Sequence, residues 1–198
     1  MALTLPCAVA LMVIPVPLIS ILFERGAFTA TDSAATGLAL AIYGLGLPAF
    51  VLQKIFQPLY FAREDTRRPF YFALVSMLVN VVVAVGLWST LDYLSAALAT
   101  SLASWSMVAL LWFFARGYGQ AAQFDTRVKQ RLPRILAACL LMGVVLYGLA
   151  YVMAPALQLA GWRYLALAVL LTLGALSYAR AFGAFVPAEL RASLKRKR

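Results

Sequence analysis

One lysine lies inside a long apolar stretch of this sequence, where a charge needs a chemical reason. Lys54 stands between Gln53 and Gln57 and nine residues before Arg63, which places it about 13 Å from that arginine along a helix axis. A charged side chain at the centre of a bilayer costs about 2.5–3.5 kcal/mol on insertion scales. Two interpretations remain open. Either the lysine faces a water-filled cavity and meets an anionic group there, or its stem extends to the membrane interface and Pro58 ends the regular helix early.

Other residues suited to catalysis or metal binding are scarce. The sequence contains no His, which is the commonest general base and the commonest metal ligand. Its two cysteines, Cys7 and Cys139, both lie in apolar stretches, where a thiol usually packs as a small hydrophobe. The sequence also lacks the phosphate-binding loop G-x-x-x-x-G-K-[ST] and the hydrolase motifs H-E-x-x-H and G-x-S-x-G. We therefore expect no catalytic residue, no metal, no cofactor and no ATP-driven motor within this chain.

The elements that must position Lys54 follow from the composition. Apolar residues make up 64% of the 198 residues, charged residues make up 12%, and the mean hydropathy is +0.89. Soluble domains contain about 45–50% apolar and about 25% charged residues. The apolar residues form blocks close to the length of about 20 residues that a helix needs to cross a bilayer. We predict an all-α integral membrane protein whose six transmembrane helices lie at residues 2–22, 33–62, 70–88, 94–115, 135–154 and 164–186.

Prolines and polar residues predict the shape of the first two helices. Pro15 and Pro17 indicate that the first helix is kinked or broken. Thr31 or Asp32 is expected to cap the N-terminus of the second helix. That helix would extend about 43 Å, which exceeds the hydrocarbon core, so we expect it to be tilted, kinked or continued into the interface.

The positive charges are distributed unevenly over the predicted loops. Of the 17 Lys and Arg residues, 13 fall in loops and a tail on one face of the membrane and two fall on the other face. Because cytoplasmic loops have an excess of Lys and Arg, this alternation places both termini in the cytoplasm. We expect the net charge of +10 to meet anionic membrane lipids, and we expect no nucleic-acid partner.

Two stretches carry a resemblance to a known family. The first is LFERGAFT at residues 22–29, followed by Asp32, and it resembles the L-[FY]-[EQ]-R-G-x-F-T-x-x-D element of the MurJ (MviN) lipid II flippase family. The second is KIFQPLYFAREDTRRP at residues 54–69, and it resembles that family's K-x-x-x-P-x-[FY]-[YF]-[AS]-x-x-D-x-[KR]-x-P segment. Their order and spacing also agree with the family.

The resemblance implies a fold of 14 transmembrane helices in the MOP exporter superfamily, of which these six blocks resemble helices 9–14. Residues 1–115 would be four helices of the second flippase lobe, and residues 135–186 would be the two C-terminal helices whose groove holds the lipid tail. Residues 116–134 and 187–198 would be a basic cytoplasmic loop and a basic cytoplasmic tail. Only part of a family member is present, so the missing N-terminal helices or a partner chain would be needed to complete the cavity.

The resemblance also assigns site residues. Lys54 matches a family lysine on a helix that borders the central cavity, and Arg63 matches the cytoplasmic end of that helix. Together with Gln57, which lies between them, these are the candidate substrate-binding residues.

The function implied is that of a membrane transporter and not of an enzyme. It is the translocation of lipid II, the undecaprenyl-linked peptidoglycan precursor, across the bacterial cytoplasmic (inner) membrane for cell wall synthesis. Alternating access between two helical lobes would be driven by an ion gradient or the membrane potential. Two alternatives stay open: another polysaccharide-lipid flippase of the same superfamily, and a non-transporting membrane scaffold subunit.

Overall fold

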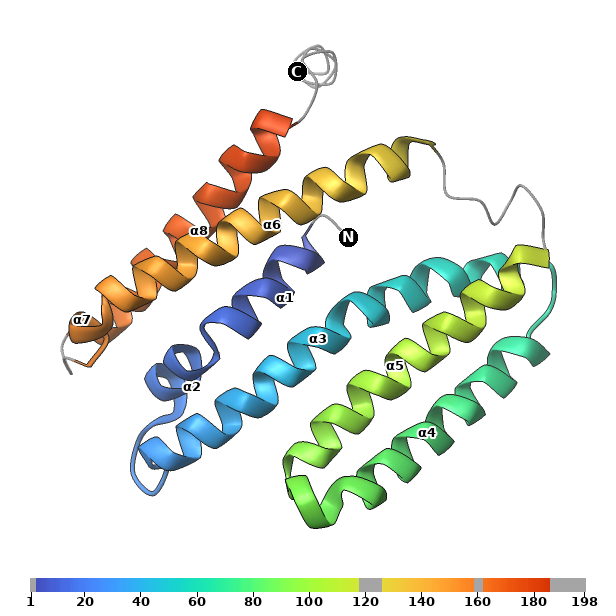
Figure 1. The fold of residues 1–198 in the computed structure, drawn as a ribbon, viewed down its shortest axis with the longest axis horizontal. Coiled ribbons are helices and arrows are strands. Elements are labelled where there is room, and N and C mark those ends of the chain that lie inside the picture. Colours follow the sequence, from blue (N-terminus) through green and yellow to red (C-terminus); the bar gives the residue numbers. More distant parts are fainter. Residues whose placement is uncertain (1–2, 118–125, 159–161, 186–198) are drawn as a thin grey trace.

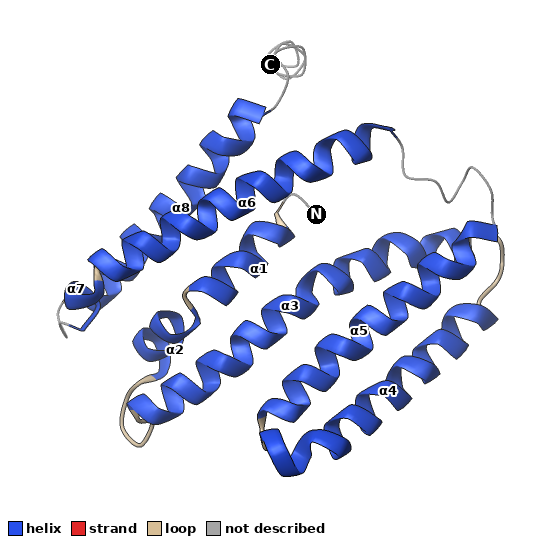
Figure 2. Cartoon of the chain, viewed as in Figure 1, coloured by secondary structure: helices blue, strands red, loops and turns tan. Residues whose placement is uncertain are grey.

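The structure is a computed structural model that describes residues 3–117, 126–158 and 162–185. Within these ranges every regular element is a helix (Figure 2). Five helices are long and apolar enough to cross a membrane, and the bent pair α1 and α2 is a sixth crossing if it forms one span. This confirms the predicted all-α membrane architecture. The helices are α1 (Thr4–Val13), α2 (Pro15–Phe23), α3 (Ala30–Phe61), α4 (Arg67–Leu91), α5 (Leu94–Ala115), α6 (Thr126–Val152), α7 (Ala154–Gln158) and α8 (Arg163–Phe185).

The first apolar block is broken into α1 and α2, which meet at an angle of 79°. Pro15 and Pro17 have no backbone N–H, so two carbonyls of α1 lose the donors that a continuous helix would supply. Ile14, at the break, is fully buried. A Cβ atom added at Gly37 of α3 would lie 2.9 Å from Val16 Cγ2 and 3.2 Å from the Val16 backbone nitrogen. The break therefore rests directly on the backbone of α3, and only glycine fits at that contact.

The N-terminus of α3 is fixed by a capping box. Thr29 is the N-cap, and its hydroxyl accepts a hydrogen bond from the backbone N–H of Asp32, while the Asp32 carboxylate accepts one from the backbone N–H of Thr29 at 2.8 Å. The prediction that Thr31 or Asp32 is the N-cap was wrong, because the helix begins earlier and Asp32 is its third residue.

Two prolines lie inside α3 without ending it. The helix runs through Pro48 and Pro58 to Phe61, a total of 32 residues and about 48 Å. The possibility that Pro58 ends the helix early is therefore wrong. Proline has no backbone N–H to donate to the carbonyl four residues earlier, a loss that membrane helices tolerate.

Two other helices begin before the apolar blocks that predicted them. Helix α4 begins at Arg67 instead of residue 70, and α6 begins at Thr126 instead of residue 135. Hydropathy locates only the apolar part of a helix, whereas Arg and Lys are good helix formers and extend it into the interface. Residues 126–134 of the predicted basic loop are thus part of α6.

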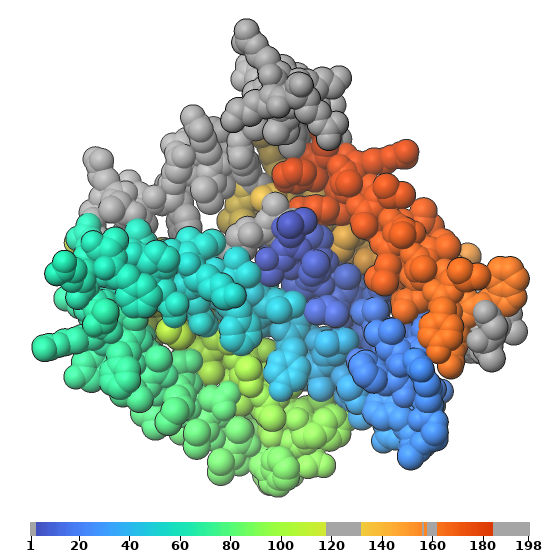
Figure 3. All heavy atoms as spheres, turned by 180° about the vertical axis from the view of Figure 1, so that it is seen from behind, coloured from blue at the N-terminus to red at the C-terminus, as the bar shows by residue number. Residues whose placement is uncertain are grey.

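The helices form a row in which α5 packs between α4 and α3, and α1 and α2 pack on the other side of α3 (Figure 1). Helices α6 and α8 pack against each other, and α6 also contacts α1. Seen from behind in Figure 3, α5 is partly covered between α3 and α4. Two cores result. One joins α3, α4 and α5 and contains Tyr60, Phe72 and Leu111, and the other joins α1, α6 and α8 through Ile14, Leu146 and Leu170.

Candidate functional site

Lys54 lies on the exposed surface of α3, seven residues before the last residue of the helix. Seven residues correspond to about 10 Å along the axis, so the lysine lies well inside the span and not at its end. Phe50 lies one turn earlier and is 41% exposed. The helix thus presents a cation with an aromatic neighbour on a surface that the described residues leave uncovered.

The two glutamines that the sequence places beside Lys54 have different positions. Gln53 turns toward α5 and donates a hydrogen bond from Nε2 to the Ser104 carbonyl oxygen at 3.0 Å. It therefore joins two helices. Gln57 is half-buried and lies about 60° around the helix from Lys54, so the structure brings these two candidates to adjoining positions of one surface.

Arg63 lies outside α3, in the exposed turn that leads to α4. Its backbone N–H donates to the Tyr60 carbonyl oxygen at 3.0 Å, and the next residue, Glu64, has a left-handed backbone with φ of 58°. Arg63 thus follows the last residue of α3 and does not lie on the helix with Lys54 and Gln57. Its assignment to substrate binding stays a prediction.

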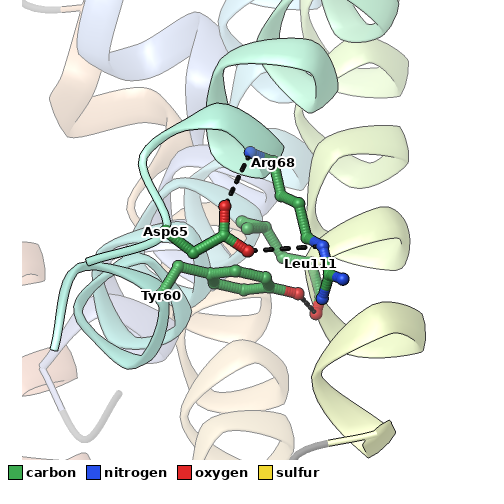
Figure 4. Close-up of polar contacts among 4 residues, drawn as sticks. All are labelled: Tyr60, Asp65, Arg68 and Leu111. Atoms are coloured by element: carbon green, nitrogen blue, oxygen red, sulfur yellow. Dashed lines mark hydrogen bonds and ion pairs between the residues drawn. The ribbon is translucent and has the colours of Figure 1, made fainter. Parts of the chain in front are cut away.

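The second motif of the sequence builds the junction of α3, α4 and α5 (Figure 4). Tyr60 is fully buried, and its hydroxyl donates to the Leu111 carbonyl oxygen of α5 at 2.6 Å. Asp65 accepts a hydrogen bond from the Arg68 backbone N–H at 3.2 Å and forms an ion pair with the Arg68 Nε at 3.3 Å. Asp65 thus caps the first turn of α4, and these motif residues hold helices in place.

The first motif builds the turn from α2 to α3 in a similar way. Gly26 has a φ of 61°, a conformation that glycine adopts without steric cost. The Glu24 carboxylate accepts a hydrogen bond at 3.1 Å from the hydroxyl of Ser33, which is buried in α3. The capping box of Thr29 and Asp32 completes the turn. The residues that are most distinctive in the sequence are therefore those that join helices.

A second surface lies beyond α1. A groove of about 500 Å³ opens between α1, α6 and α8, and its lining is almost entirely apolar. Met142, Leu146 and Leu171 line it from α6 and α8, while Pro6 and Cys7 line it from α1. The family resemblance implied a groove between the last two spans, but it did not indicate the contribution of α1. Hydropathy contains no information about which two spans α1 lies against.

Among the residues that the structure describes, no three His, Cys, Asp or Glu side chains lie close enough together to hold a metal ion. The fold and the two surfaces define a multi-pass helical membrane protein with a broken span, a feature of secondary transporters. One surface offers a cation and an amide, and the other offers an apolar groove one helix away.

Comparison with known proteins identifies the family within this class. The family model described as lipid II flippase MurJ matches residues 1–165. The chain therefore belongs to the MurJ lipid II flippase family, and it is a multi-pass protein of the inner membrane. It is 44% identical over 145 residues to a probable lipid II flippase MurJ of Rhizobium meliloti (strain 1021), a match covering 73% of this chain and 27% of that protein. A probable lipid II flippase MurJ of Rhizobium tropici is 37% identical over 157 residues, covering 78% and 29%.

A solved structure extends the likeness to the fold. The chain is similar to a lipid II flippase MurJ in an inward closed conformation, with a TM-score of 0.72 and 27% sequence identity. That match covers 92% of this chain and 36% of the other, so it reaches into α8, most of which lies beyond the residues that the family model matches. The chain spans less than a third of the length of the two Rhizobium relatives.

Proposed function

We propose that this chain forms part of a flippase that moves lipid II, the undecaprenyl-linked peptidoglycan precursor, across the cytoplasmic membrane for cell wall synthesis. One observation supports it above the others: the exposed Lys54 surface of α3 and the apolar groove lie on either side of α1, which packs against both α3 and α6. An amphipathic substrate needs this pair of surfaces. The headgroup would meet the cation and amide of Lys54 and Gln57, and the lipid tail would occupy the groove.

The groove fits the chemistry of a polyprenyl tail. Its volume of about 500 Å³ is in the range of sites that bury small ligands, and it is partly open to the surface. Leu146 and Gly174 contribute to both the lining and the contact between α6 and α8. A chain of methyl and methylene groups gains free energy by contact with such a lining and needs no polar partner.

The remaining parts of the proposal concern topology and assembly. Both termini would be cytoplasmic, as the charge distribution predicts, and Arg63 would lie at the cytoplasmic end of the headgroup path. Other helices, from the same polypeptide or from a partner chain, would complete the cavity around Lys54 and Gln57. A reporter fused at the C-terminus should be active in the cytoplasm, and activity only outside it would overturn this topology.

Substitution of Lys54 tests the substrate assignment. In the complete flippase, Lys54→Gln should reduce rescue of a flippase-depleted bacterium and cause lipid II to accumulate in the inner leaflet, while Lys54→Arg should retain most activity because it keeps the charge. Equal amounts of both variants in the membrane, measured by immunoblotting, provide the control. Full rescue by Lys54→Gln would contradict a role for the cation in transport.

A further inference from the structure

Helix α3 has a polar line along one exposed face. Thr36 lies 18 residues before Lys54, which is five full turns at about 3.6 residues per turn, so the two side chains leave the helix in the same direction. Tyr43 lies within about 20° of this line. Thr36 and Lys54 are exposed, and Tyr43 is 41% exposed.

The opposite face of α3 is formed by leucines. Leu45 lies about 180° from Lys54 around the helix, and Leu38 lies about 160° from it. Their side chains are 47% and 53% exposed. Each leucine is two residues from a member of the polar line, at nearly the same depth in the membrane. Depth therefore does not explain the difference in chemistry between the faces.

A hydrogen bond from α5 shows on which side of the row of helices the leucine face of α3 lies. The Trp105 indole N–H donates to the Leu45 carbonyl oxygen at 2.9 Å, so Trp105 lies on the leucine side. Trp112 lies within about 20° of Trp105 on α5 and is 42% exposed. The leucine side of the row thus also includes the exposed indole rings of Trp105 and Trp112.

The other side of α5 is polar. Thr100 lies about 140° from Trp105 around α5, and its hydroxyl accepts a hydrogen bond at 3.4 Å from the Asn80 amide of α4. This places Thr100 and Asn80 on the same side of the helix row as Lys54. The Lys54 side of the row therefore presents hydroxyl, amide and ammonium groups beside apolar side chains such as Leu47 and Phe50, whereas the other side presents hydrocarbon and indole.

The three polar residues of this face are spread over nearly the thickness of the membrane, with Leu47 and Phe50 of the same face between Tyr43 and Lys54. Eighteen residues from Thr36 to Lys54 correspond to about 27 Å along the helix, against a hydrocarbon core of about 30 Å. A substrate whose headgroup crosses the membrane needs polar partners along most of that distance, because an unsatisfied polar group in hydrocarbon costs several kcal/mol.

We infer that Tyr43 and Thr36 are further headgroup contacts, which continue the path from Lys54 toward the outer end of α3. The occupant is the anionic, hydrogen-bonding headgroup of the lipid-linked substrate, since Lys54 supplies the complementary positive charge and the two hydroxyls supply donors and acceptors. This inference rests on the proposed function. During transport, the headgroup would contact Lys54, Tyr43 and Thr36 one after another.

Thiol accessibility tests the inference without requiring transport. In the complete flippase with Cys7→Ala and Cys139→Ala, single cysteines are placed at Thr36, Tyr43 and Lys54, and a membrane-impermeant maleimide is applied to intact bacteria and to inverted vesicles. Matched controls are Leu38→Cys and Leu45→Cys. Because maleimide reacts with the thiolate, which does not form in hydrocarbon, we expect the three polar-face positions to react at least about tenfold faster than the leucine positions. Added lipid II should slow the reaction at Tyr43 and Thr36.

Each result of this experiment has a defined meaning. If the leucine positions react as fast as Tyr43→Cys, the assignment of the two faces is wrong. Reaction at Lys54→Cys without reaction at the other two positions would overturn the extended path and leave the proposed function intact. If Lys54→Cys is also unreactive from both sides, the proposed function fails with it. Labelling that lipid II does not slow would show a water-filled face without a headgroup contact, and would overturn the inference.

The rate of lipid II translocation provides a second test, because at equal membrane abundance it does not depend on how much of the variant folds. Tyr43→Ala should lower the rate of lipid II translocation about three- to tenfold at equal membrane abundance, which corresponds to the loss of one hydrogen-bonding group. Leu45→Ala should leave the rate unchanged, because its side chain faces the opposite side. Equal rates for Tyr43→Ala and the unsubstituted protein would contradict a headgroup contact at this position.

Discussion

The layer of α3, α5 and α4 differs from the groove assembly of α1, α6 and α8 in that some of its hydroxyl groups bond between helices, although Thr100, Ser104 and Ser106 donate within α5. In the layer, Ser101 of α5 donates to the Ile42 carbonyl oxygen of α3 at 2.8 Å, and Ser76 of α4 donates to a carbonyl of α5 at 2.7 Å. In α8, the hydroxyls of Thr172 and Ser177 donate to carbonyls of their own helix. The layer is thus joined by directional bonds, whereas apolar contacts join the groove assembly around Leu146.

This difference has a mechanical consequence. A hydrogen bond weakens steeply with angle, so bonds between helices in hydrocarbon fix both the register and the rotation of each helix. Apolar contacts are individually weak and have no preferred direction, so they restrain the register and rotation of a helix less strictly. The layer can therefore hold the Lys54 face in one orientation, while the groove can adjust its width to a lipid tail, as the proposed function requires.

Removal of the Tyr60 ring, at the centre of the layer, should lower the free energy of unfolding most. Tyr60→Ala deletes a fully buried ring that makes an edge-to-face contact with Phe72, with ring centroids 6.0 Å apart. We expect a loss of about 3–5 kcal/mol in the free energy of unfolding, measured by denaturant titration in detergent. Tyr60→Phe should cost only about 0.6–1.7 kcal/mol, because it removes the bond to Leu111 and keeps the packing. Equal losses for both variants would show that the hydrogen bond, and not the packing, dominates.

A methyl group added at a helix contact should distinguish the two regions. At Gly37 the new Cβ would meet the backbone of Val16, which has no alternative position, and we expect Gly37→Ala to cost about 1–3 kcal/mol. At Gly174 it would meet the Leu146 side chain at 2.6 Å, which can change rotamer, so the cost should be smaller. Gly86→Ala, with nothing within 4 Å, controls for helix propensity. Thermal unfolding in detergent measures all three, and a larger loss at Gly174 would reverse the comparison.

Removal of a single hydroxyl group should change the free energy of unfolding least. Ser101→Ala removes an interhelical bond and should cost about 0.6 kcal/mol, the average for such bonds in membrane proteins. Ser177→Ala removes only a bond within α8 to the Gly174 carbonyl, which is already part of the helix, so we expect no measurable change. A double-mutant cycle with Gln53→Ala then asks whether the bonds of the layer act together. Equal losses for the two serine variants would remove the distinction between the regions.

The sequence predicted the helices more accurately than it predicted their ends. Pro15 and Pro17 indicated the break in the first span, and the structure confirms it because proline removes backbone donors wherever it occurs. The N-cap of α3 was misplaced by two or more residues, since Thr29, Thr31 and Asp32 are all suitable caps and only the turn built around Gly26 selects among them. The start of α6 was missed because Lys and Arg lower the mean hydropathy of its first turns.

The role of the candidate site stays a prediction, and the structure shows only where its residues lie. Lys54 was distinguished by its charge inside an apolar block, and it is exposed on α3. Gln53 has the same chemistry as Gln57, yet it bonds to α5, and no pattern in the sequence distinguishes the two. The motif residues Tyr60 and Asp65 hold helices together, which is a role that resemblance to a family does not reveal.

By itself, the sequence determined that the chain is helical and spans a membrane, where its helices break, and to which family it is similar, because these depend on local composition, proline chemistry and short motifs. Only the tertiary structure decided which face of α3 is polar and exposed, and that α1 forms a wall of the groove. The physical reason is that a helix has side chains all around its axis. Which of them contact a neighbour depends on the packing of Gly37, Gln53 and Tyr60 against helices that are distant in the sequence.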